Sequence, residues 1–373
     1  MKIVVTGAGG LIGWHAHARL HAGNCAARFR GQAVPYAMVA LNHAGFADDA
    51  VLQAAVQGAD GVLHFAGVNR APDDEVEAAN PAIAARLVAA CQAVGAMPHI
   101  VYANSTHAVS DTPYGRSKRI AAERLAVFAQ RYTDLILPHI FGEGARAYYN
   151  NVTATLIDQI IAGKAVTVNP DGRVQLVHAG VAAQAAIDAV LAGTCGEVRP
   201  EPRVLGVPDL LGRLQAFHDL YQRNIYPAFA DDFDVALFNT YRAATYPGGW
   251  PRQLTLHTDA RGTLFEAAKG GSGGQTFLST TKPGVTRGDH FHLHKVERFL
   301  VVQGQATIRI RKVLTDEVWE YPVSGDAPAP VDMPTLHTHS IENTGTGDLM
   351  TLFWTHDQFD PAIPDTYADK VLT

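Results

Sequence analysis

The sequence is poor in cysteine and has no long run of a single charge sign or of apolar residues. Its only cysteines are Cys25, Cys91 and Cys195, an odd number of residues far apart in the chain. This argues against a disulfide framework and favours reduced thiols in a cytoplasmic protein. The missing basic run disfavours a nucleic-acid partner. We expect no membrane partner either, because no apolar stretch reaches the roughly 18–20 residues of a spanning helix, and no signal peptide precedes the first strand-like run.

The composition is that of a globular protein. Apolar residues make up 47% of the 373 residues, charged residues make up 18%, and the net charge is −6. These values exclude a largely disordered chain. The length exceeds the usual size of one domain, so we expect two domains.

The first part of the chain alternates strand-like and helix-like segments. Apolar runs at residues 2–6 and 99–103 are separated by alanine-rich stretches, including residues 11–20 and 81–93. This alternation predicts a doubly wound parallel α/β sheet of the Rossmann type. A mostly helical stretch follows to about residue 242, and we expect it to be an appendage of the first domain.

A second pattern begins after residues 246–251, which read YPGGWP and have neither helical nor strand periodicity. Short β-rich runs then follow one another without helices, which predicts an antiparallel sandwich or barrel. We therefore expect an α/β domain at residues 1–245, a linker at 246–252 and an all-β domain at 253–373. The glycine-rich residues 270–274 are interpreted as a loop inside the β domain.

The segment TGAGGLIG at residues 6–13 follows a strand and opens a helix. Its glycines Gly7, Gly10 and Gly13 permit a tight turn, close approach of the backbone to a pyrophosphate, and close helix–strand packing. The free N–H groups at the start of the helix, where Leu11 and Ile12 lie, attract the pyrophosphate. This position at the start of a βαβ unit predicts a dinucleotide site.

The end of the second strand indicates which dinucleotide is bound. Residues 39–43 read VALNH and contain none of the carboxylates that usually contact a plain ribose. This favours NADP(H) over NAD(H). Arg28, Arg30 and His43 are candidates for contacting its 2′-phosphate.

Tyr114 and Lys118 lie four residues apart at the start of a predicted helix, one turn from each other on one face. At about 4 Å and an effective dielectric near 20, a lysine cation stabilises a phenolate by roughly 4 kcal/mol. This lowers the tyrosine pKa by up to about 3 units from its free value near 10. Such a tyrosine can protonate a carbonyl oxygen as hydride arrives. A hydroxyl in residues 104–106 can hold the same oxygen.

A second group of chemically active residues lies in the β-rich region. His290 and His292 are two residues apart in a predicted strand and face the same way, and Glu297 returns beyond a short turn. A later run, residues 334–343, offers one more imidazole. Such a nitrogen and oxygen donor set suits Zn²⁺, Fe²⁺, Mn²⁺ or Ni²⁺.

Three histidines on the first predicted helix form a weaker pattern. His17 and His21 are four residues apart, and His15 lies nearby. Without a third ligand, such histidines more often face solvent, so we expect no metal site there.

The first half of the chain resembles the extended short-chain dehydrogenase/reductase family. The matching pieces are TGAGGLIG, the segment HFAG at residues 64–67, Ser105, Tyr114 and Lys118. The resemblance implies a nicotinamide cofactor that also contacts Ala66 and Gly67, a nucleotide-sugar substrate, and catalysis by Ser105, Tyr114 and Lys118.

Two departures from this family concern substrate recognition. Ile136 and His139 occupy the places of an arginine and an asparagine that many relatives carry. Residues 178–183 replace the usual late Val-Asp-Asp segment.

Residues 284–304 resemble the first motif of the cupin family, G-x5-H-x-H-x3,4-E-x6-G. The resemblance implies His290, His292 and Glu297 as metal ligands. The register of the second motif selects His339 rather than His337 as the fourth ligand. Supporting or acid–base roles are then open to His294 and His337, while Lys282 and Arg287 lie on the approach to the metal, where they would bind phosphate or stabilise an enolate.

The whole chain resembles a group of capsule-polysaccharide enzymes of the N-acetyl-L-fucosamine pathway, in which a reductase domain precedes a cupin. Shared stretches span both domains, at residues 63–70, 299–302, 323–326 and 359–361. The resemblance implies C3 epimerisation of a UDP-4-keto-6-deoxy-N-acetylhexosamine in the cupin and NADPH reduction of its C4 ketone to a UDP-6-deoxy-L-talosamine-type product. It also implies zinc and a homodimer joined through the cupins.

Two other functions are compatible with parts of this pattern. An NAD-dependent sugar-nucleotide 4-epimerase or a dehydratase would consume no NADPH, and a dehydratase is disfavoured because Asn104 and Thr106, not an acid, flank Ser105. A non-catalytic nucleotide-sugar-binding protein would be expected to have lost the Tyr/Lys pair or the metal ligands, and both sets are intact.

Overall fold

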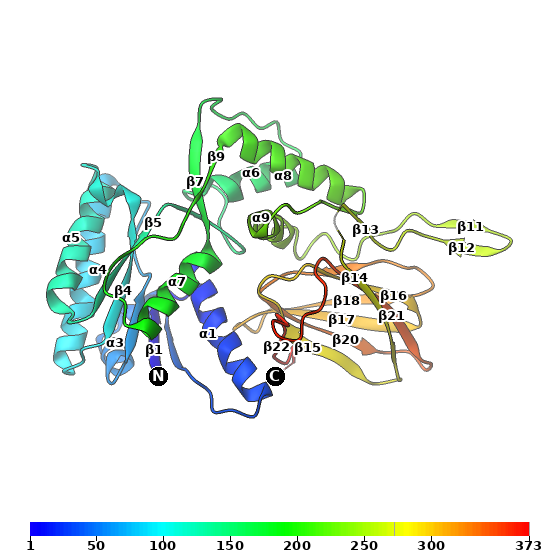
Figure 1. Ribbon diagram of the computed structural model, residues 1–373, viewed down its shortest axis with the longest axis horizontal. Helices are drawn as coiled ribbons and strands as arrows, with labels where there is room; N and C mark the ends of the chain where they lie inside the picture. The colour runs from blue at the N-terminus through cyan, green and yellow to red at the C-terminus, as the bar shows by residue number, and fades with distance from the viewer. Residues whose placement is uncertain (272, 373) are drawn as a thin grey trace. The chain divides into compact units, whose positions relative to one another are not determined.

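The computed structural model describes residues 1–271 and 273–372, which form two compact units (Figure 1). The first unit contains residues 1–155 and 168–207, and the second contains residues 156–167 together with the chain from residue 208 onward. The glycine-rich segment 270–274 includes Ser272, which lies outside the described residues. Within the described part of the chain, no helix has the length and apolarity needed to cross a membrane.

The first unit is built on a six-stranded parallel sheet with the order β2-β1-β3-β4-β5-β8. Its strands are β1 (Lys2–Thr6), β2 (Ala37–Leu41), β3 (Gly61–His64), β4 (His99–Ser105), β5 (Tyr132–Leu137) and β8 (Gly196–Val198). The connecting helices are α1 (Leu11–Phe29), α2 (His43–Ala47), α3 (Asp49–Val56), α4 (Asp73–Ala93), the 3₁₀ turn η1 (Thr106–Val109), α5 (Pro113–Phe128) and α7 (Ala179–Ala192). The expected doubly wound sheet is confirmed.

Alternation of side chains along the strands divides the core into two layers. On β1, Val4 packs with residues of α3, α4 and α5, whereas Ile3 and Val5 pack on the other face with α1 and α7. Alanines such as Ala16 and Ala183 line the second layer and allow the two helices to approach closely. Both faces of the sheet are therefore covered by helices, as the apolar character of its strands requires.

A smaller three-stranded sheet lies in the same unit. Its strands are β6 (His139–Phe141), β7 (Arg173–His178) and β9 (Arg203–Gly206). The helix α6 (Val152–Ile161) follows β6 along the chain.

The second unit contains two antiparallel sheets, in the orders β14-β21-β16-β19 and β18-β17-β20-β15-β22. Their strands are β14 (Gln275–Thr281), β15 (Thr286–Phe291), β16 (Glu297–Gln303), β17 (Gln305–Lys312), β18 (Val318–Ser324), β19 (Val331–Met333), β20 (His337–Asn343), β21 (Leu349–Thr355) and β22 (Tyr367–Ala368). This arrangement confirms the expected all-β sandwich. Short strand pairs precede it: β10 (Ile225–Tyr226) with β13 (Lys269–Gly270), and β11 (His257–Asp259) with β12 (Gly262–Leu264).

The helices α8 (Val207–Gln222) and α9 (Asp232–Ala243) pack against this β region. The Tyr221 hydroxyl donates to Asp332 Oδ2 at 2.5 Å, and Asp332 pairs with Arg298 at 2.6 Å, all three being completely buried. Arg242 of α9 donates to the Met333 carbonyl at 3.1 Å. The compact units divide near residue 207. The sequence predicts the domain boundary at residues 246–252, and that boundary stays a prediction.

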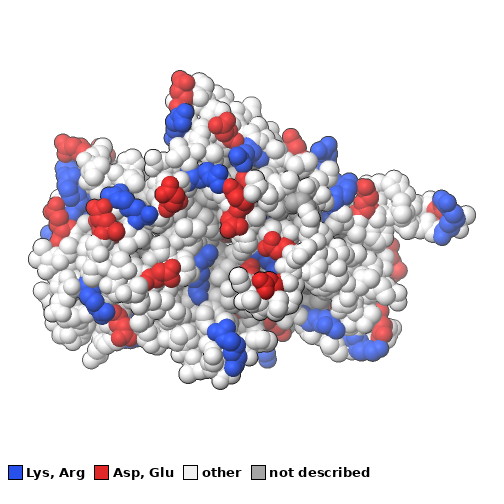
Figure 2. Space-filling model, in the orientation of Figure 1, with Lys and Arg blue, Asp and Glu red and all other residues white. Residues whose placement is uncertain are grey.

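The visible face of the molecule carries acidic and basic side chains side by side (Figure 2). Exposed ion pairs of the protein include Arg199 with Glu197 and Arg261 with Asp259. Exposed pairs of this kind contribute little to stability, whereas removing one partner of the buried Arg298–Asp332 pair is strongly destabilising.

We expect Asp332→Asn to lower the free energy of unfolding by about 3–5 kcal/mol, because it leaves the buried Arg298 without its counter-charge. Burial alone raises the pKa of Asp332, but Arg298 more than offsets this and holds the pKa below its ordinary value. The ion pair therefore contributes its full stabilisation above the unfolded-state pKa of about 3.9. This contribution is lost as the pH falls through the lower folded-state pKa. Urea denaturation at pH 7 measures the loss, with the exposed Asp326→Asn as the control. Equal midpoints for the two variants would contradict this account.

Candidate active and metal-binding sites

The turn between β1 and α1 has the glycine geometry that a dinucleotide site needs. Gly7 has φ +66°, and a Cβ there would lie 2.8 Å from the Ala66 nitrogen. A Cβ on Gly13 would lie 2.2 Å from the Gly7 carbonyl oxygen. Gly10 caps α1 without a side-chain hydrogen bond, so no side chain covers the first N–H groups of Leu11 and Ile12. An anion such as a pyrophosphate can lie at this helix end.

The loop after β3 is held beside this turn by a residue that the sequence motifs do not identify. Asn80 of α4 exchanges two hydrogen bonds with Val68, at 2.9 and 3.0 Å, and donates to Ser117 of α5 at 2.9 Å. Its Oδ1 would be 2.9 Å from a Cβ on Gly67. Asn80 thus ties the Ala66–Gly67 loop to the helix that carries the catalytic candidates. In the sequence, the available signal for this role is that Asn80 stands directly before a proline.

Two of the three candidates for the 2′-phosphate lie far from the turn. Arg28 and Arg30 are at the C-terminal end of α1, and Arg28 is 17 residues beyond Leu11. At 1.5 Å per residue this is about 26 Å along the helix. A helix that follows a parallel strand returns to the opposite edge of the sheet, so these two residues are not positioned to contact the cofactor there. His43 directly follows the end of β2 and keeps its candidacy.

The structure brings Ser105, Tyr114 and Lys118 together. Ser105 is the last residue of β4, and Thr112 caps α5 by accepting the Gly115 N–H at 3.1 Å. A hydrogen bond joins the side chains of Ser105 and Tyr114. Lys118 donates to the Ala103 carbonyl at 2.5 Å. A Cβ on Gly115 would lie 2.4 Å from the His107 carbonyl oxygen, so this glycine lets the start of α5 approach η1.

The pKa of Tyr114 differs from the value that the sequence predicts. Burial raises the pKa of Tyr114, and its hydrogen bond with Ser105 only partly opposes that rise. Lys118 does not lower it, because its ammonium is directed to the Ala103 carbonyl and lies 4.2 Å from the Tyr102 ring centre. Burial lowers the pKa of Lys118 to about 7. Tyr114 therefore holds its proton at neutral pH, which suits a proton donor.

The two residues that depart from the reductase-family pattern differ in burial. Ile136 is buried in β5, whereas His139 is exposed at the start of β6. The His139 ring centre is 6.4 Å from that of His107, which in turn is 6.4 Å from that of Tyr114. The rings of His107 and His139 thus lie near Tyr114. His139 departs from the family pattern, whereas no sequence motif marks His107.

His15 is completely buried and His17 and His21 are partly buried, so the expectation that these three histidines face solvent is wrong. His15 Nε2 lies 3.0 Å from the Glu143 carbonyl oxygen, and His178 Nε2 lies 2.8 Å from Glu143 Oε2. We assign the proton of each ring to Nε2, because both contacts then become hydrogen bonds. Such rings donate instead of ligating, and the group ties α1, the loop after β6 and the start of α7 together.

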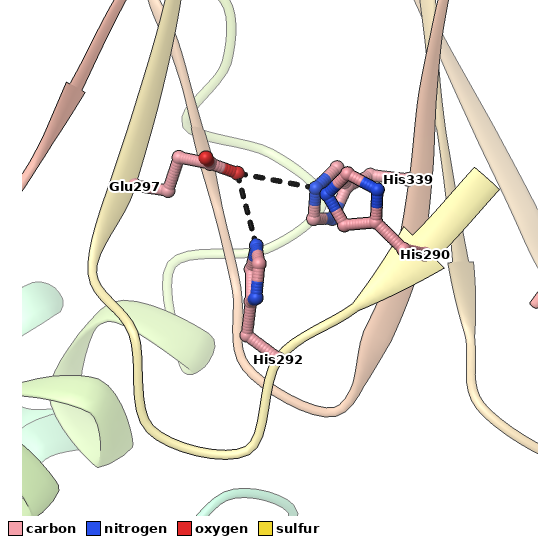
Figure 3. Close-up of side chains that lie close together, drawn as sticks. All are labelled: His290, His292, Glu297 and His339. Atoms are coloured by element: carbon pink, nitrogen blue, oxygen red, sulfur yellow. Dashed lines mark hydrogen bonds and ion pairs between the residues drawn. The ribbon is translucent and has the colours of Figure 1, made fainter. Parts of the chain in front are cut away.

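The four expected metal ligands converge in the second unit (Figure 3). β15 and β20 pair antiparallel with His290 opposite His339, His292 lies just beyond β15, and Glu297 begins β16 of the other sheet. Their ligand atoms all lie within 4.8 Å of one another. The group thus bridges the two sheets.

The hydrogen bonds of these imidazoles indicate what lies between them. His292 Nδ1 is 2.5 Å from the Asp365 carbonyl oxygen, and His339 Nδ1 is 3.3 Å from the His337 carbonyl oxygen. With their protons on Nδ1, both rings direct an unprotonated Nε2 at Glu297 Oε2, at 3.1 and 3.2 Å. Lone pairs facing a buried carboxylate repel one another unless a cation lies among them. This donor set therefore fits a divalent metal such as zinc.

Burial by itself raises the pKa of the Glu297 carboxyl group, whereas positive charge at His292 and His339 lowers it well below the ordinary value. With both rings neutral, as assigned above, a bound cation would supply that positive charge and keep Glu297 ionised.

A cavity of about 680 Å³ opens beside this group. His290, His292 and Glu297 contribute to its wall, as do Arg287 and the stacked rings of Phe277 and Phe353, whose centres are 5.0 Å apart. This volume is in the range of small-molecule sites. Of the residues that the sequence analysis placed on the approach to the metal, Arg287 is found here.

The other candidates for the cupin reaction are placed elsewhere. Lys282 is 75% exposed and pairs with Asp348 at 2.7 Å, outside the residues that line the cavity. His337 is buried and stacks on Trp319 with ring centres 5.4 Å apart. These positions do not support catalytic roles for either residue. Instead, Lys295 and Asp357 line the cavity, and no sequence motif marks them.

Comparisons with known proteins cover the whole chain. Residues 3–197 match the model of the NAD dependent epimerase/dehydratase family, and residues 257–367 match that of the polysaccharide biosynthesis C-terminal domain. The UDP-2-acetamido-2,6-beta-L-arabino-hexul-4-ose reductase of Pseudomonas aeruginosa is 30% identical over 383 residues, covering 100% of this chain and 99% of that protein.

Among solved structures, the capsular polysaccharide assembling protein CapF from Staphylococcus aureus is 29% identical, with a TM-score of 0.59 and full coverage of both chains. CapF with the inhibitor 3-isopropenyl-tropolone is 28% identical, with a TM-score of 0.53 and the same coverage. Both units of the present chain therefore have counterparts in single proteins.

We expect Gly13→Ala to abolish dinucleotide binding, because the added methyl group would lie 2.2 Å from the Gly7 carbonyl oxygen and force the turn open. Fluorescence titration with NADPH and NADH measures the effect, and circular dichroism checks the fold. Gly9→Ala is the matched control, since a Cβ there has no atom within 4 Å. Unchanged cofactor affinity in a folded Gly13→Ala variant would argue against this turn as the cofactor site.

Proposed function

The chain belongs to the NAD dependent epimerase/dehydratase family, and on this premise we propose that it is a two-step nucleotide-sugar enzyme. Its β-rich region epimerises C3 of a UDP-linked 4-keto-6-deoxy-N-acetylhexosamine. Its α/β region then reduces the C4 ketone with NADPH, giving a UDP-6-deoxy-L-talosamine-type sugar for a capsule or O-antigen polysaccharide. The comparisons confirm the resemblance to capsule-polysaccharide reductase/epimerases on which the sequence analysis relies.

The observation that carries the proposal is that two intact constellations share one chain. Ser105, Tyr114 and Lys118 lie beside a dinucleotide turn, and His290, His292, Glu297 and His339 converge beside a cavity of small-molecule size. The two chemistries suit one substrate, because a ketone at C4 makes the neighbouring C3 proton acidic and is itself the group that hydride reduces. A non-catalytic binding protein has no need of either set.

In the reduction, Ser105 holds the carbonyl oxygen by its hydroxyl, and the protonated Tyr114 donates a proton to that oxygen as hydride arrives at C4. Lys118 donates to the Ala103 carbonyl and so holds the end of β4, which carries Ser105, beside α5. The lack of a carboxylate in residues 39–43 supports NADPH as the hydride donor.

In the epimerisation, His290, His292, Glu297 and His339 hold the metal, which we take to be zinc. A divalent ion held there would act as a Lewis acid toward the substrate carbonyl and so make the C3 proton more acidic. Arg287 lines the same cavity and is suited to the substrate's phosphates. A homodimer joined through the cupins is part of the same proposal.

Incubation with NADPH and the UDP-4-keto sugar in D₂O should give cofactor oxidation and deuterium at C3. Tyr114→Phe removes the proton donor, so we expect oxidation to fall by about 10²–10⁴-fold while deuterium uptake continues. His290→Ala should lose uptake and still reduce the epimer when that epimer is supplied. Mass spectrometry and NMR of the sugar measure both reactions. Loss of uptake in a folded Tyr114→Phe variant would overturn the division of labour, and a 4-epimerase would show no net oxidation.

The metal part of the proposal predicts about one divalent ion per chain. We expect Glu297→Gln to weaken metal retention, because the ligand loses its charge and the two Nε2 atoms lose their counterpart. Elemental analysis after gel filtration measures the ion content. His337→Gln is the matched control, since His337 faces Trp319. Equal metal content in the two variants would sink the assignment of this donor set.

A further inference from the structure

The cavity beside the four proposed metal ligands contains a carboxylate that no sequence motif identifies. Among the described residues that line this cavity, the carboxylates are Glu297 and Asp357. Glu297 is directed at His292 and His339. Asp357 is therefore the carboxylate of this wall that remains for another role.

Asp357 is held by its neighbour in the chain. His356 and Val296 exchange two hydrogen bonds: the His356 N–H donates to the Val296 carbonyl at 3.1 Å, and the Val296 N–H donates to His356 Nδ1 at 3.0 Å. Because Nδ1 accepts, the neutral ring carries its proton on Nε2. That atom lies 3.1 Å from Asp357 Oδ2, a close contact that does not have the geometry of a hydrogen bond.

The ring is itself fixed in place. The His356 side chain is only 4% exposed, and it meets Phe229 edge-on with ring centres 5.7 Å apart. Burial lowers the pKa of His356 to about 3, so the ring is neutral at neutral pH. Its contact with Oδ2 restricts the position of the carboxylate without neutralising its charge.

The environment also strengthens Asp357 as a base. Its side chain is 54% exposed, and partial burial raises its pKa above the ordinary value. The charged groups around it act in both directions, since His294 and Lys295 favour the ionised form and Asp232 and Asp365 oppose it. The Thr355 hydroxyl donates to the Asp357 carbonyl at 2.7 Å and holds the backbone of the loop.

We propose that Asp357 is the base that removes the C3 proton in the epimerisation, with His356 as its positioning residue. This inference rests on the proposed function of the cavity. His356 engages Oδ2, and Oδ1 takes the proton from C3 while the electrons of the C–H bond move toward C4 and its oxygen. Water then protonates C3 on the opposite face, and the hydroxide formed takes the proton back from Asp357.

Asp357→Asn tests the base in the full-length, metal-loaded protein. We expect C3 deuterium uptake to fall by about 10²–10⁴-fold, while metal content, KM for the sugar and NADPH-dependent reduction of supplied epimer stay the same. Asp360→Asn is the matched control, since it removes a charge three residues away and does not line the cavity. Asp357→Ser, which also lacks the carboxylate, decides the matter if the Asn variant is unstable.

His356→Phe tests the positioning role. It keeps a buried ring but removes the Nε2 atom that contacts Asp357 Oδ2 at 3.1 Å, and a less well positioned carboxylate predicts a fall of about 10-fold or more in kcat for uptake. KM and metal content should not change, which separates positioning from a general loss of structure. His356→Gln supplies both an acceptor and a donor and should retain more activity than the Phe variant.

The outcomes separate the two levels of the argument. Wild-type uptake in Asp357→Asn would overturn the assignment of the base and leave the proposed function intact. Absence of uptake in the metal-loaded wild type would overturn the proposed epimerisation and this inference together.

Discussion

The second unit is organised around unprotonated imidazole nitrogens that face a buried carboxylate. His292 and His339 give their Nδ1 protons to backbone carbonyls, so their Nε2 lone pairs point at Glu297. A cation among these atoms would relieve their repulsion, and the two β-sheets supply the four side chains from opposite sides. The proposed roles of the cavity, its aromatic wall and Asp357 all depend on this centre. A cation there would polarise a substrate carbonyl, and a polarised carbonyl makes the neighbouring carbon acidic.

Protons are positioned by burial and backbone contacts in the first unit as well. Tyr114 keeps its proton because its hydroxyl is buried, and Lys118 has a lowered pKa for the same reason. A protonated tyrosine beside Ser105 suits the reduction of a ketone. Spacing along the helix predicts that Lys118 lowers the pKa of Tyr114, whereas in the structure burial raises this pKa and the ammonium contacts the Ala103 carbonyl. Spacing along a helix does not specify which carbonyl an ammonium contacts.

Local patterns were most reliable where the chemistry is contained in one short segment. The turn from Gly7 to Gly13 requires glycine because the backbone passes itself within contact distance, and this could be inferred from the sequence. Helix α4 shows the opposite case: the sequence suggested a start at Pro81, but the helix begins at Asp73 and contains the proline. A proline lacks only one hydrogen bond, and tertiary packing of the helix outweighed that loss.

The sequence by itself determined the two folds, the glycine turn, the Ser105–Tyr114–Lys118 group and the group of Glu297 with three histidines. Each of these depends on spacing within a strand, a turn or a helix, which the order of residues specifies directly. Only the tertiary structure decided that α8 and α9 pack on the β region, that Lys282 and His337 lie away from the cavity, and that Asp357 lines it. Asp357 is 60 residues from Glu297 along the chain, and such proximity comes from strand pairing and loop packing, which leave no local pattern in the sequence.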